Sequence, residues 1–286
     1  MSDEHVDATV ASETAPSTTH VLGAIVRREL RTVARTGTFL VLTGVVSIVL
    51  LGIAWIGGGL RAGYVPTAVD LLTPLELLVP IVAVAFGYRA ILGDEQRGEL
   101  EVLRTYPVSS WQLVVGVYLG RAAGVIVAIA IPLVVVFVAI AMTGAETVRV
   151  YATHAGADSP VLFARVIVLT VLFALVVLSV ALAISAIAGG TRSALALAVV
   201  ALVVLLVGAD LAIVYGFATG VIGDSSLVYT MALSPLSAFR GLVLETAVVV
   251  AAGTGPRTAS PIASLFGLGL WTAVSLVVAI LGVEGA

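Results

Sequence analysis

Six long apolar segments alternate with short polar ones along the chain. Each apolar segment has about 19 residues or more and few charges, which is long enough for a helix to cross ~30 Å of hydrocarbon. We therefore expect an all-α integral membrane protein with six transmembrane helices. The expected spans cover about 38–60, 74–92, 111–142, 160–188, 193–219 and 262–283.

An amphipathic pattern precedes the first span, between His20 and Arg35. Such a helix lies in the headgroup plane of a membrane, with its basic side chains toward lipid phosphates; the alternative is an ordinary basic cluster beside a span. Residues 1–19 are small, polar and acidic, and we expect a disordered cytoplasmic tail there. The apolar face consists of Leu22, Ile25, Val26, Leu30 and Val33, and the basic one of Arg27, Arg28, Arg31 and Arg35, with Glu29 among them.

Two short signatures mark expected helix starts. Residues 73–76 (TPLE) have the spacing of a capping box with proline in the first turn, so we interpret Glu76 as a capping residue rather than an acid inside the membrane. Ser109 and Gln112 repeat the spacing before the third span.

By contrast, Leu242–Ala252 is too short to cross a membrane, and we interpret it as an interfacial or re-entrant helix in the connection before the last span.

Composition agrees with a membrane protein and excludes several kinds of chemistry. Hydrophobic residues make up 60% of the 286 positions and charged ones 11%, with a mean hydropathy of +1.18, whereas a soluble domain carries about 25% charged residues. There is no cysteine, and all 14 basic residues are arginine. Without lysine there is no complete Walker A loop, so if ATP drives this protein, a partner subunit must bind it. We expect no catalytic residue, no cofactor bound directly and no nucleic-acid partner.

The side chains that bind soft metals are few and scattered. Copper sites use clusters of thiolate, thioether or imidazole ligands. The candidate ligands here are Met1, Met142, Met231, His5, His20 and His154. We therefore predict no metal site in this chain.

Arginine is distributed unequally between the expected loops. With a cytoplasmic N-terminus, nine arginines fall in cytoplasmic segments and five in external ones. The positive-inside rule then predicts a plasma-membrane protein with both termini, and the segment 93–110, in the cytoplasm.

That segment, GDEQRGELEVLRTYPVSS, is the longest charged stretch outside the tail. Arg97 and Glu101 are spaced i,i+4, and Glu101 and Arg104 i,i+3, which predicts a short surface helix. Leu100 and Leu103 could face the membrane or a protein partner.

The same segment resembles the one that ABC-2 type transporter permeases use to contact their ATPase. The matching residues are Asp94-Glu95, Gly98-Glu99-Leu100-Glu101 and Pro107-Val108-Ser109, and Arg27-Arg28-Glu29-Leu30 resembles the N-terminal elbow helix of that family. Within the family, the likeness is strongest to the NosY branch, the permease for nitrous oxide reductase maturation, through Gly52–Trp55, Tyr88–Glu95, Thr105–Pro107 and the residues Leu233–Leu236 with Phe239-Arg240.

This resemblance implies a single transmembrane domain over 20–286 with a cytoplasmic coupling helix. It also implies a separate cytoplasmic ATPase, a homodimer of permeases, and a periplasmic or extracellular maturation protein as a further partner. No permease residue does covalent chemistry in such a transporter. The coupling residues would be Asp94, Glu95, Arg97, Gly98, Glu99, Leu100, Glu101, Leu103 and Pro107.

Asp210 is the one acid well inside an expected apolar span. Charges at membrane depth usually face the bundle interior or water. Asp210 could therefore line a translocation path or pair with Arg165 or Arg240; alternatively, it could lie near the outer interface.

Other functions remain open on the sequence alone. An ATPase-independent secondary transporter or channel would need more polar residues inside the membrane and, commonly, internal repeats. A non-transporting membrane anchor for an ATPase is a further alternative. An intramembrane protease is disfavoured, because neither the Gly-x-Ser-Gly nor the His-Glu-x-x-His motif occurs.

Overall fold

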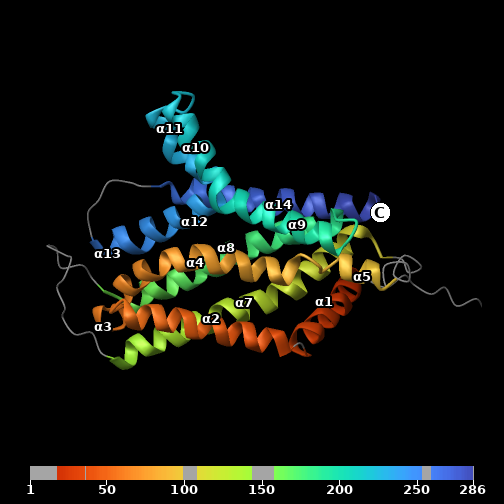
Figure 1. Cartoon of the computed structure of the whole chain (residues 1–286), viewed down its shortest axis with the longest axis horizontal. Coiled ribbons are helices and arrows are strands. Elements are labelled where there is room, and N and C mark those ends of the chain that lie inside the picture. Colours follow the sequence, from red (N-terminus) through yellow and green to blue (C-terminus); the bar gives the residue numbers. More distant parts are fainter. Residues whose placement is uncertain (1–17, 36, 99–107, 144–157, 253–258, 286) are drawn as a thin grey trace, which may run out of the picture.

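The computed structural model describes residues 18–35, 37–98, 108–143, 158–252 and 259–285, and all regular structure in these ranges is helical (Figure 1). The long helices lie side by side in a bundle, and α1 lies across one end of it. The α-helices are α1 (Thr18–Arg35), α2 (Gly37–Ile56), α3 (Gly59–Ala62), α4 (Tyr64–Gly87), α5 (Leu92–Gln96), α7 (Ser110–Thr143), α8 (Pro160–Ile187), α9 (Thr191–Val203), α10 (Ala209–Ala218), α11 (Asp224–Thr230), α12 (Pro235–Val243), α13 (Val249–Ala252) and α14 (Pro261–Gly285). Two π-helical segments, η1 (Val204–Gly208) and η3 (Leu244–Val248), and one 3₁₀ turn, η2 (Met231–Leu233), connect some of them.

Within the described residues, seven helices, rather than the six predicted, are long and apolar enough to cross a membrane. The additional one is continuous through α12, η3 and α13. It begins seven residues before the predicted interfacial segment, because Ser234 caps it: the Ser234 Oγ accepts a hydrogen bond from Ser237 N at 3.3 Å, and Pro235 follows the cap. The seven candidates are Phe39–Ile56, Tyr64–Gln96, Ser110–Thr143, Pro160–Ile187, Thr191–Ala218, Pro235–Ala252 and Pro261–Gly285.

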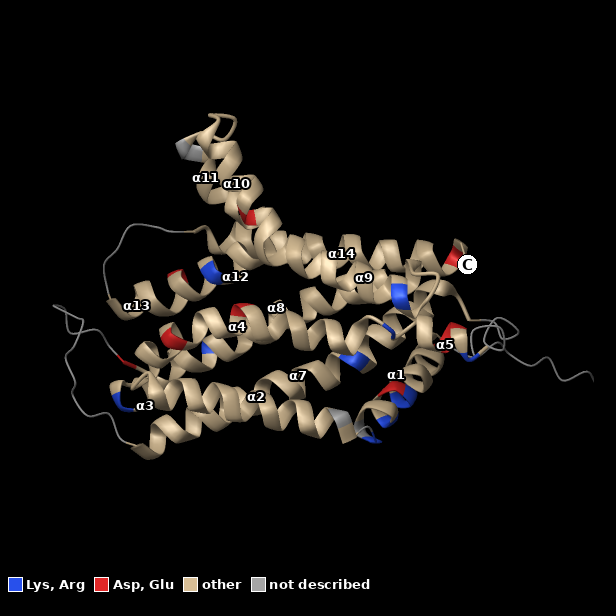
Figure 2. Ribbon diagram, in the orientation of Figure 1, with Lys and Arg blue, Asp and Glu red and all other residues tan. Residues whose placement is uncertain are grey.

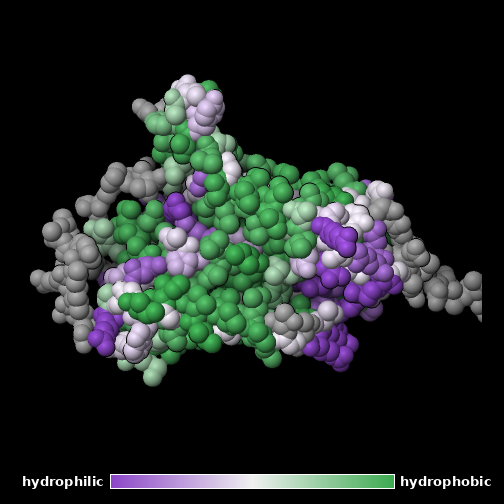
Figure 3. Space-filling model, viewed as in Figure 1, coloured by the Kyte–Doolittle hydropathy of each residue, from purple (hydrophilic) through white to green (hydrophobic). Residues whose placement is uncertain are grey.

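α8 is the central helix of the bundle. It packs against α4, α7 and α14, and large side chains such as Phe173 and Leu182 are fully buried on it. Phe173 also stacks on Phe239 of α12, with ring centroids 4.8 Å apart. By contrast, the outer faces of α2, α9, α10 and α14 remain apolar and exposed, as the hydrophobic belt in Figure 3 shows. Such an exposed apolar belt is typical of a surface that contacts lipid.

α4 begins at Tyr64, well before the predicted start near Pro74. The carboxylate of Asp158 caps it by accepting hydrogen bonds from Tyr64 N at 3.0 Å and Val65 N at 2.8 Å. Glu76 therefore lies in the middle of α4, and its interpretation as a capping residue is wrong. The signature failed because TPLE also occurs inside a helix when another residue supplies the cap.

The second capping signature is confirmed in part. Ser109 N donates to the Gln112 Oε1 at 3.0 Å, which is the reciprocal half of a capping box. α7 begins directly afterwards, at Ser110.

α1 packs tightly on α7 through a row of glycines. A Cβ on Gly116 would lie 2.7 Å from the Ile25 side chain, and one on Gly120 only 2.3 Å from the Glu29 Cβ. Val33 meets a third glycine one turn further. Part of the apolar face predicted to contact lipid is thus buried in the protein, with Leu30 left exposed. The predicted tail, 1–19, lies outside the described residues apart from Thr18 and Thr19, which belong to α1.

α9 continues through the π-helical segment η1 into α10, and α10 and α11 project away from the bundle (Figure 1). The chain then returns through η2, which packs on α14. There the Trp271 Nε1 donates to the Leu233 carbonyl at 2.8 Å. This arrangement places Asp210, at the start of α10, close enough to Arg240 of α12 for the two charges to interact.

Candidate functional site

Charged residues gather at the end of the bundle formed by α1 and α5, and a sparser set lies along α4, α8, α10 and α12 (Figure 2). The first group contains the predicted elbow residues and the described part of the predicted coupling residues. The second lies on helices that are long and apolar enough to cross a membrane.

Asp94 is the centre of the first group. It lies on α5, is 3% exposed, and its Oδ1 accepts from the Arg97 Nη2 at 2.6 Å. Its Oδ2 accepts from the Arg28 Nη2 of α1. A buried carboxylate is stable only when it is paired and hydrogen-bonded, so Asp94 fixes α5 to α1.

Glu29 extends this network to α7. It is 2% exposed, and its Oε1 accepts from the Arg28 Nη2 at 2.9 Å while its Oε2 accepts from the Arg121 Nε at 2.7 Å. Burial lowers the pKa of the Arg28 guanidinium, but the attraction of Asp94 and Glu29 outweighs this and raises the pKa above the usual arginine value. Arg28 therefore stays charged at any physiological pH.

Hydroxyl and amide contacts hold α5 from the opposite side. The Ser185 Oγ of α8 accepts from Ile91 N at 3.0 Å and Leu92 N at 3.1 Å. The Gln96 side chain and the Thr191 hydroxyl, at the start of α9, lie 3.2 Å apart in hydrogen-bond contact. Together with Arg28, these groups tie α5 to α1, α8 and α9.

The structure describes the first part of the predicted coupling segment. Glu95 is exposed, and Gly98 has a φ of +71°, a conformation that favours glycine. Arg97 pairs with Asp94, a partner that was not predicted. The residues Glu99, Leu100, Glu101, Leu103 and Pro107 lie outside the described residues, as do the predicted pairs of Glu101.

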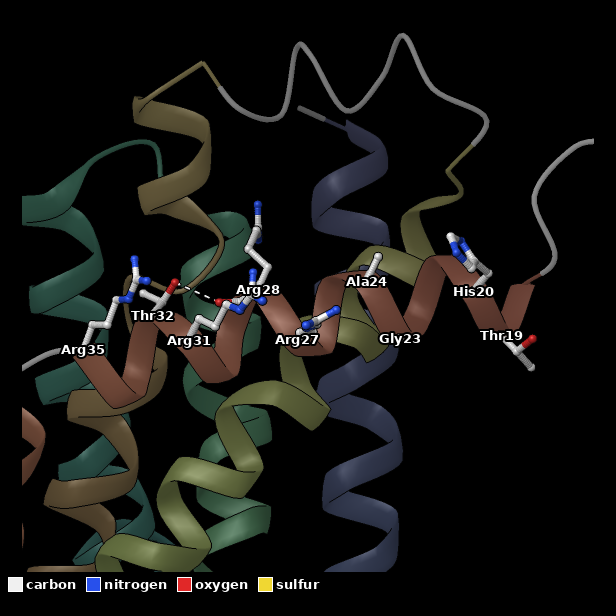
Figure 4. Close-up of a pocket in the computed structure, with 9 residues that line it drawn as sticks. All are labelled: Thr19, His20, Gly23, Ala24, Arg27, Arg28, Arg31, Thr32 and Arg35. Carbon is white, nitrogen blue, oxygen red and sulfur yellow. Dashed lines mark hydrogen bonds between the residues drawn. The ribbon is translucent and has the colours of Figure 1, made fainter.

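The elbow arginines line an open groove of about 760 Å³ along α1. Figure 4 shows Arg27, Arg31 and Arg35 on successive turns, with Arg28 next to Arg27. Arg27, Arg31 and Arg35 are exposed, and they make no hydrogen bond or ion pair with the described part of the chain. Arg28 differs, because it is held by carboxylates.

The second group is centred on Glu76 and Arg240, which the sequence analysis did not identify as a pair. The Glu76 carboxylate of α4, 5% exposed, accepts from the Arg240 Nε at 2.6 Å and also from its Nη2. A bidentate pair of this kind is among the strongest polar contacts in proteins. Two sequence features could have indicated the pair: Glu76 lies deep in an apolar segment, and Arg240 lies in what was predicted to be the connection before the last span.

Asp210 lies beside this pair but bonds elsewhere. Its Oδ1 accepts from the Ser237 Oγ of α12 at 2.9 Å, and Arg240 attracts it electrostatically. Neither predicted arginine forms a hydrogen bond with it: Arg240 binds Glu76, and the Arg165 Nη1 donates to the Thr246 carbonyl.

In the described part of the chain, no group of three or more His, Cys, Asp and Glu residues is placed to hold a metal ion.

Comparison with known proteins agrees with this organisation. Two curated relatives are each named "Probable ABC transporter permease protein NosY". The one from Pseudomonas aeruginosa is 36% identical over 115 residues, which are 38% of this chain and 41% of that protein. The one from Stutzerimonas stutzeri is 32% identical over 112 residues, or 37% and 40% of the two chains. The matched region thus spans about two fifths of the length of these relatives.

A family model described as "ABC-2 family transporter protein" matches residues 23–283, which include six of the seven candidate spans in full and all but the last two residues of the seventh. This chain, a multi-pass membrane protein, therefore belongs to the ABC-2 family of transporter permeases.

Proposed function

We propose that this permease couples ATP hydrolysis by a separate cytoplasmic ATPase to transport across the plasma membrane. In this proposal its N-terminus is cytoplasmic and it works as a homodimer. The observation that carries the proposal is the attachment of α5. Asp94, Ser185 and Gln96 tie the start of the coupling segment to three different helices.

This attachment gives the segment a mechanical role. A force applied by the ATPase at the 93–107 segment would reach α1, α8 and α9 together, since each is bonded to α5. Packed helices move as rigid bodies because a close-packed interior does not deform continuously. Alternating access would follow from such a rigid-body movement, and ATP would be bound only by the partner.

The test is retention of the ATPase by a purified permease. Gly98→Arg places a long cationic side chain in the coupling segment, and Glu99→Arg reverses a charge beside it. Gly220→Arg is a matched control, because Gly220 also has a positive φ, +74°, and open space around it, but it follows α10 far from α5. We expect the first two variants to lose ATPase association and stimulated ATP turnover, and the control to keep both.

Unchanged association and turnover in both Gly98→Arg and Glu99→Arg would count against coupling through this segment. Transport that persists in proteoliposomes without an ATPase would instead support the secondary transporter or channel. An ATPase that binds and turns over without any cargo movement would support the anchor.

A role in maturation of the copper-sulfur centre of nitrous oxide reductase is the more specific proposal. It is supported by the resemblance to the NosY branch and by the two relatives that carry this name. A periplasmic or extracellular maturation protein would then be a partner, and any copper would be bound by that partner. The test is an in-frame deletion of the gene. We expect a reductase without the visible absorption of its copper-sulfur centre, restored by complementation; a normal spectrum in the deletion strain would contradict the proposal.

A further inference from the structure

A row of polar side chains interrupts the hydrophobic belt on one face of the bundle. We call it the polar track, and it consists of Asp70, Thr73 and Glu76 on α4, Arg240 on α12 and Asp210 on α10. Asp70 and Thr73 are exposed, the Arg240 side chain is 44% exposed, and Asp210 is half-buried. Figure 3 shows hydrophilic patches within the belt over α4 and α12, where Figure 2 shows charges of both signs.

The track reaches the middle of the membrane. Glu76 follows the first residue of α4 by 12 positions and precedes the last by 11, so at ~1.5 Å per residue it lies ~16–18 Å from either end. The bidentate contact balances its charge with that of Arg240. Yet the guanidinium remains accessible, and an exposed guanidinium at this depth is strongly unfavourable against hydrocarbon. This face must therefore meet water or a polar molecule.

The track has an excess of negative charge. Arg240 is its single cation, against the carboxylates of Asp70, Glu76 and Asp210. Asp210 receives a neutral hydroxyl from Ser237, which does not balance its charge. Asp70 makes no hydrogen bond or ion pair with the described residues.

Two further charged residues, Arg165 and Glu245, do not change this excess of negative charge. Arg165 donates to the Thr246 carbonyl and Glu245 precedes that residue, so the two add one charge of each sign. In a low-dielectric environment an excess of two negative charges attracts cations over a long distance.

From these observations we infer that the polar track is a water-accessible, cation-attracting passage through this half of the membrane, and that the cargo presents a positive charge to it. This inference rests on the proposed transport function, for which it specifies a class of cargo.

The absence of native cysteine makes the inference directly testable, because a single introduced thiol is the only reactive one. Thr73→Cys places the thiol in the track, one turn before Glu76. Ile48→Cys is the matched control: Ile48 is 74% exposed on α2 and lies eight residues from the end of its helix, as Thr73 lies nine from the start of α4. The full-length permease, in liposomes without ATPase, is treated with a cationic methanethiosulfonate (ethyltrimethylammonium) or an anionic one (ethylsulfonate).

With the cationic reagent, we expect the thiol of Thr73→Cys to react at least about tenfold faster than that of Ile48→Cys. We also expect its ratio of cationic to anionic reaction rates to be about tenfold higher than the same ratio for a free thiol in solution. Adding Asp70→Asn or Asp210→Asn should reduce this preference about threefold. Leu77→Cys, one turn after Thr73 on α4 and 51% exposed, provides the same test should Thr73→Cys fail to insert.

Reaction as slow as that of Ile48→Cys would show that the track is not hydrated, and a preference no greater than that of a free thiol would show that it does not select cations. Either result overturns the inference. The measurement needs no ATPase, so its failure is distinguishable from failure of the coupling proposal, which concerns the opposite end of α4.

Discussion

The contact between Glu29 and Arg121 makes a quantitative prediction about what holds the elbow helix. Glu29→Gln keeps the shape of the side chain but removes its charge, leaving Arg121 without a carboxylate. At 2.7 Å, the gross attraction between two unit charges is ~6 kcal/mol at an effective dielectric of ~20. Desolvation cancels part of this, and removing one partner of a buried pair typically costs ~3–5 kcal/mol.

The Glu29 side chain is 3% exposed and that of Arg121 20%, so we expect the lower end of this range, a loss of ~3 kcal/mol. The assay is reversible unfolding in detergent of the wild type, Glu29→Gln, Arg121→Gln and the double variant. Their double-mutant cycle should give a coupling of ~2 kcal/mol. Arg97→Gln is the comparison, because Arg97 is 60% exposed and should cost less than ~1 kcal/mol. A coupling below ~0.5 kcal/mol between Glu29 and Arg121 would refute the reasoning.

Three further substitutions probe contacts elsewhere in the bundle. Gly120→Ala should destabilise the protein by ~1–3 kcal/mol because the new Cβ would overlap α1. Gly44→Ala, which has open space around it on α2, should be neutral or slightly stabilising. Thermal unfolding measures both effects, and equal effects would contradict the packing argument. The Ser185 hydroxyl accepts hydrogen bonds from two backbone amides at the start of α5. Ser185→Ala should speed hydrogen exchange of these amides by about tenfold, because losing the contact costs ~1–2 kcal/mol. Unchanged exchange would show that the contact does not hold α5. Glu76→Gln should lower stability by ~2–3 kcal/mol, with Arg240→Gln in the same background costing little more; additive losses would mean that the two side chains are not coupled.

The six predicted spans follow from apolar length alone, and in the described residues each overlaps a helix that is long and apolar enough to cross a membrane. The seventh, Pro235–Ala252, escaped prediction because Arg240 and Glu245 lower its mean hydropathy to 1.5, the smallest value among the seven. A search for uncharged segments cannot detect a span whose charge is neutralised by another helix. Its true start also depended on a cap, Ser234, that lies in the supposed connection.

Contacts between distant residues also escaped prediction around α5 and α1. Local spacing identified Arg97 as an ion-pair former, and among the described residues it pairs with Asp94, three residues before it; its predicted partner Glu101 lies outside them. Glu29 and Arg121 are 92 positions apart, and no spacing rule links them. Their contact depends on the close approach of α1 and α7, which the glycines of α7 permit. The pattern of glycines at four-residue intervals was the available signal.

α4 connects the two polar sites, and this gives the Glu76 contact its significance. A Cβ on Gly87 would lie 2.5 Å from that of Ala181, so α4 and α8 are already as close as their backbones allow near α5. A displacement of α5 toward the membrane would therefore move α4 along its axis or tilt it as a whole, and Glu76 would move with it. Arg240 belongs to α12, which the stack of Phe239 on Phe173 fixes to α8, and α8 is itself bonded to the start of α5 through Ser185. A movement of α5 would therefore reach both partners of the ion pair, Glu76 through α4 and Arg240 through α8 and α12, and two residues 164 positions apart could be assigned this position only from their contact in space.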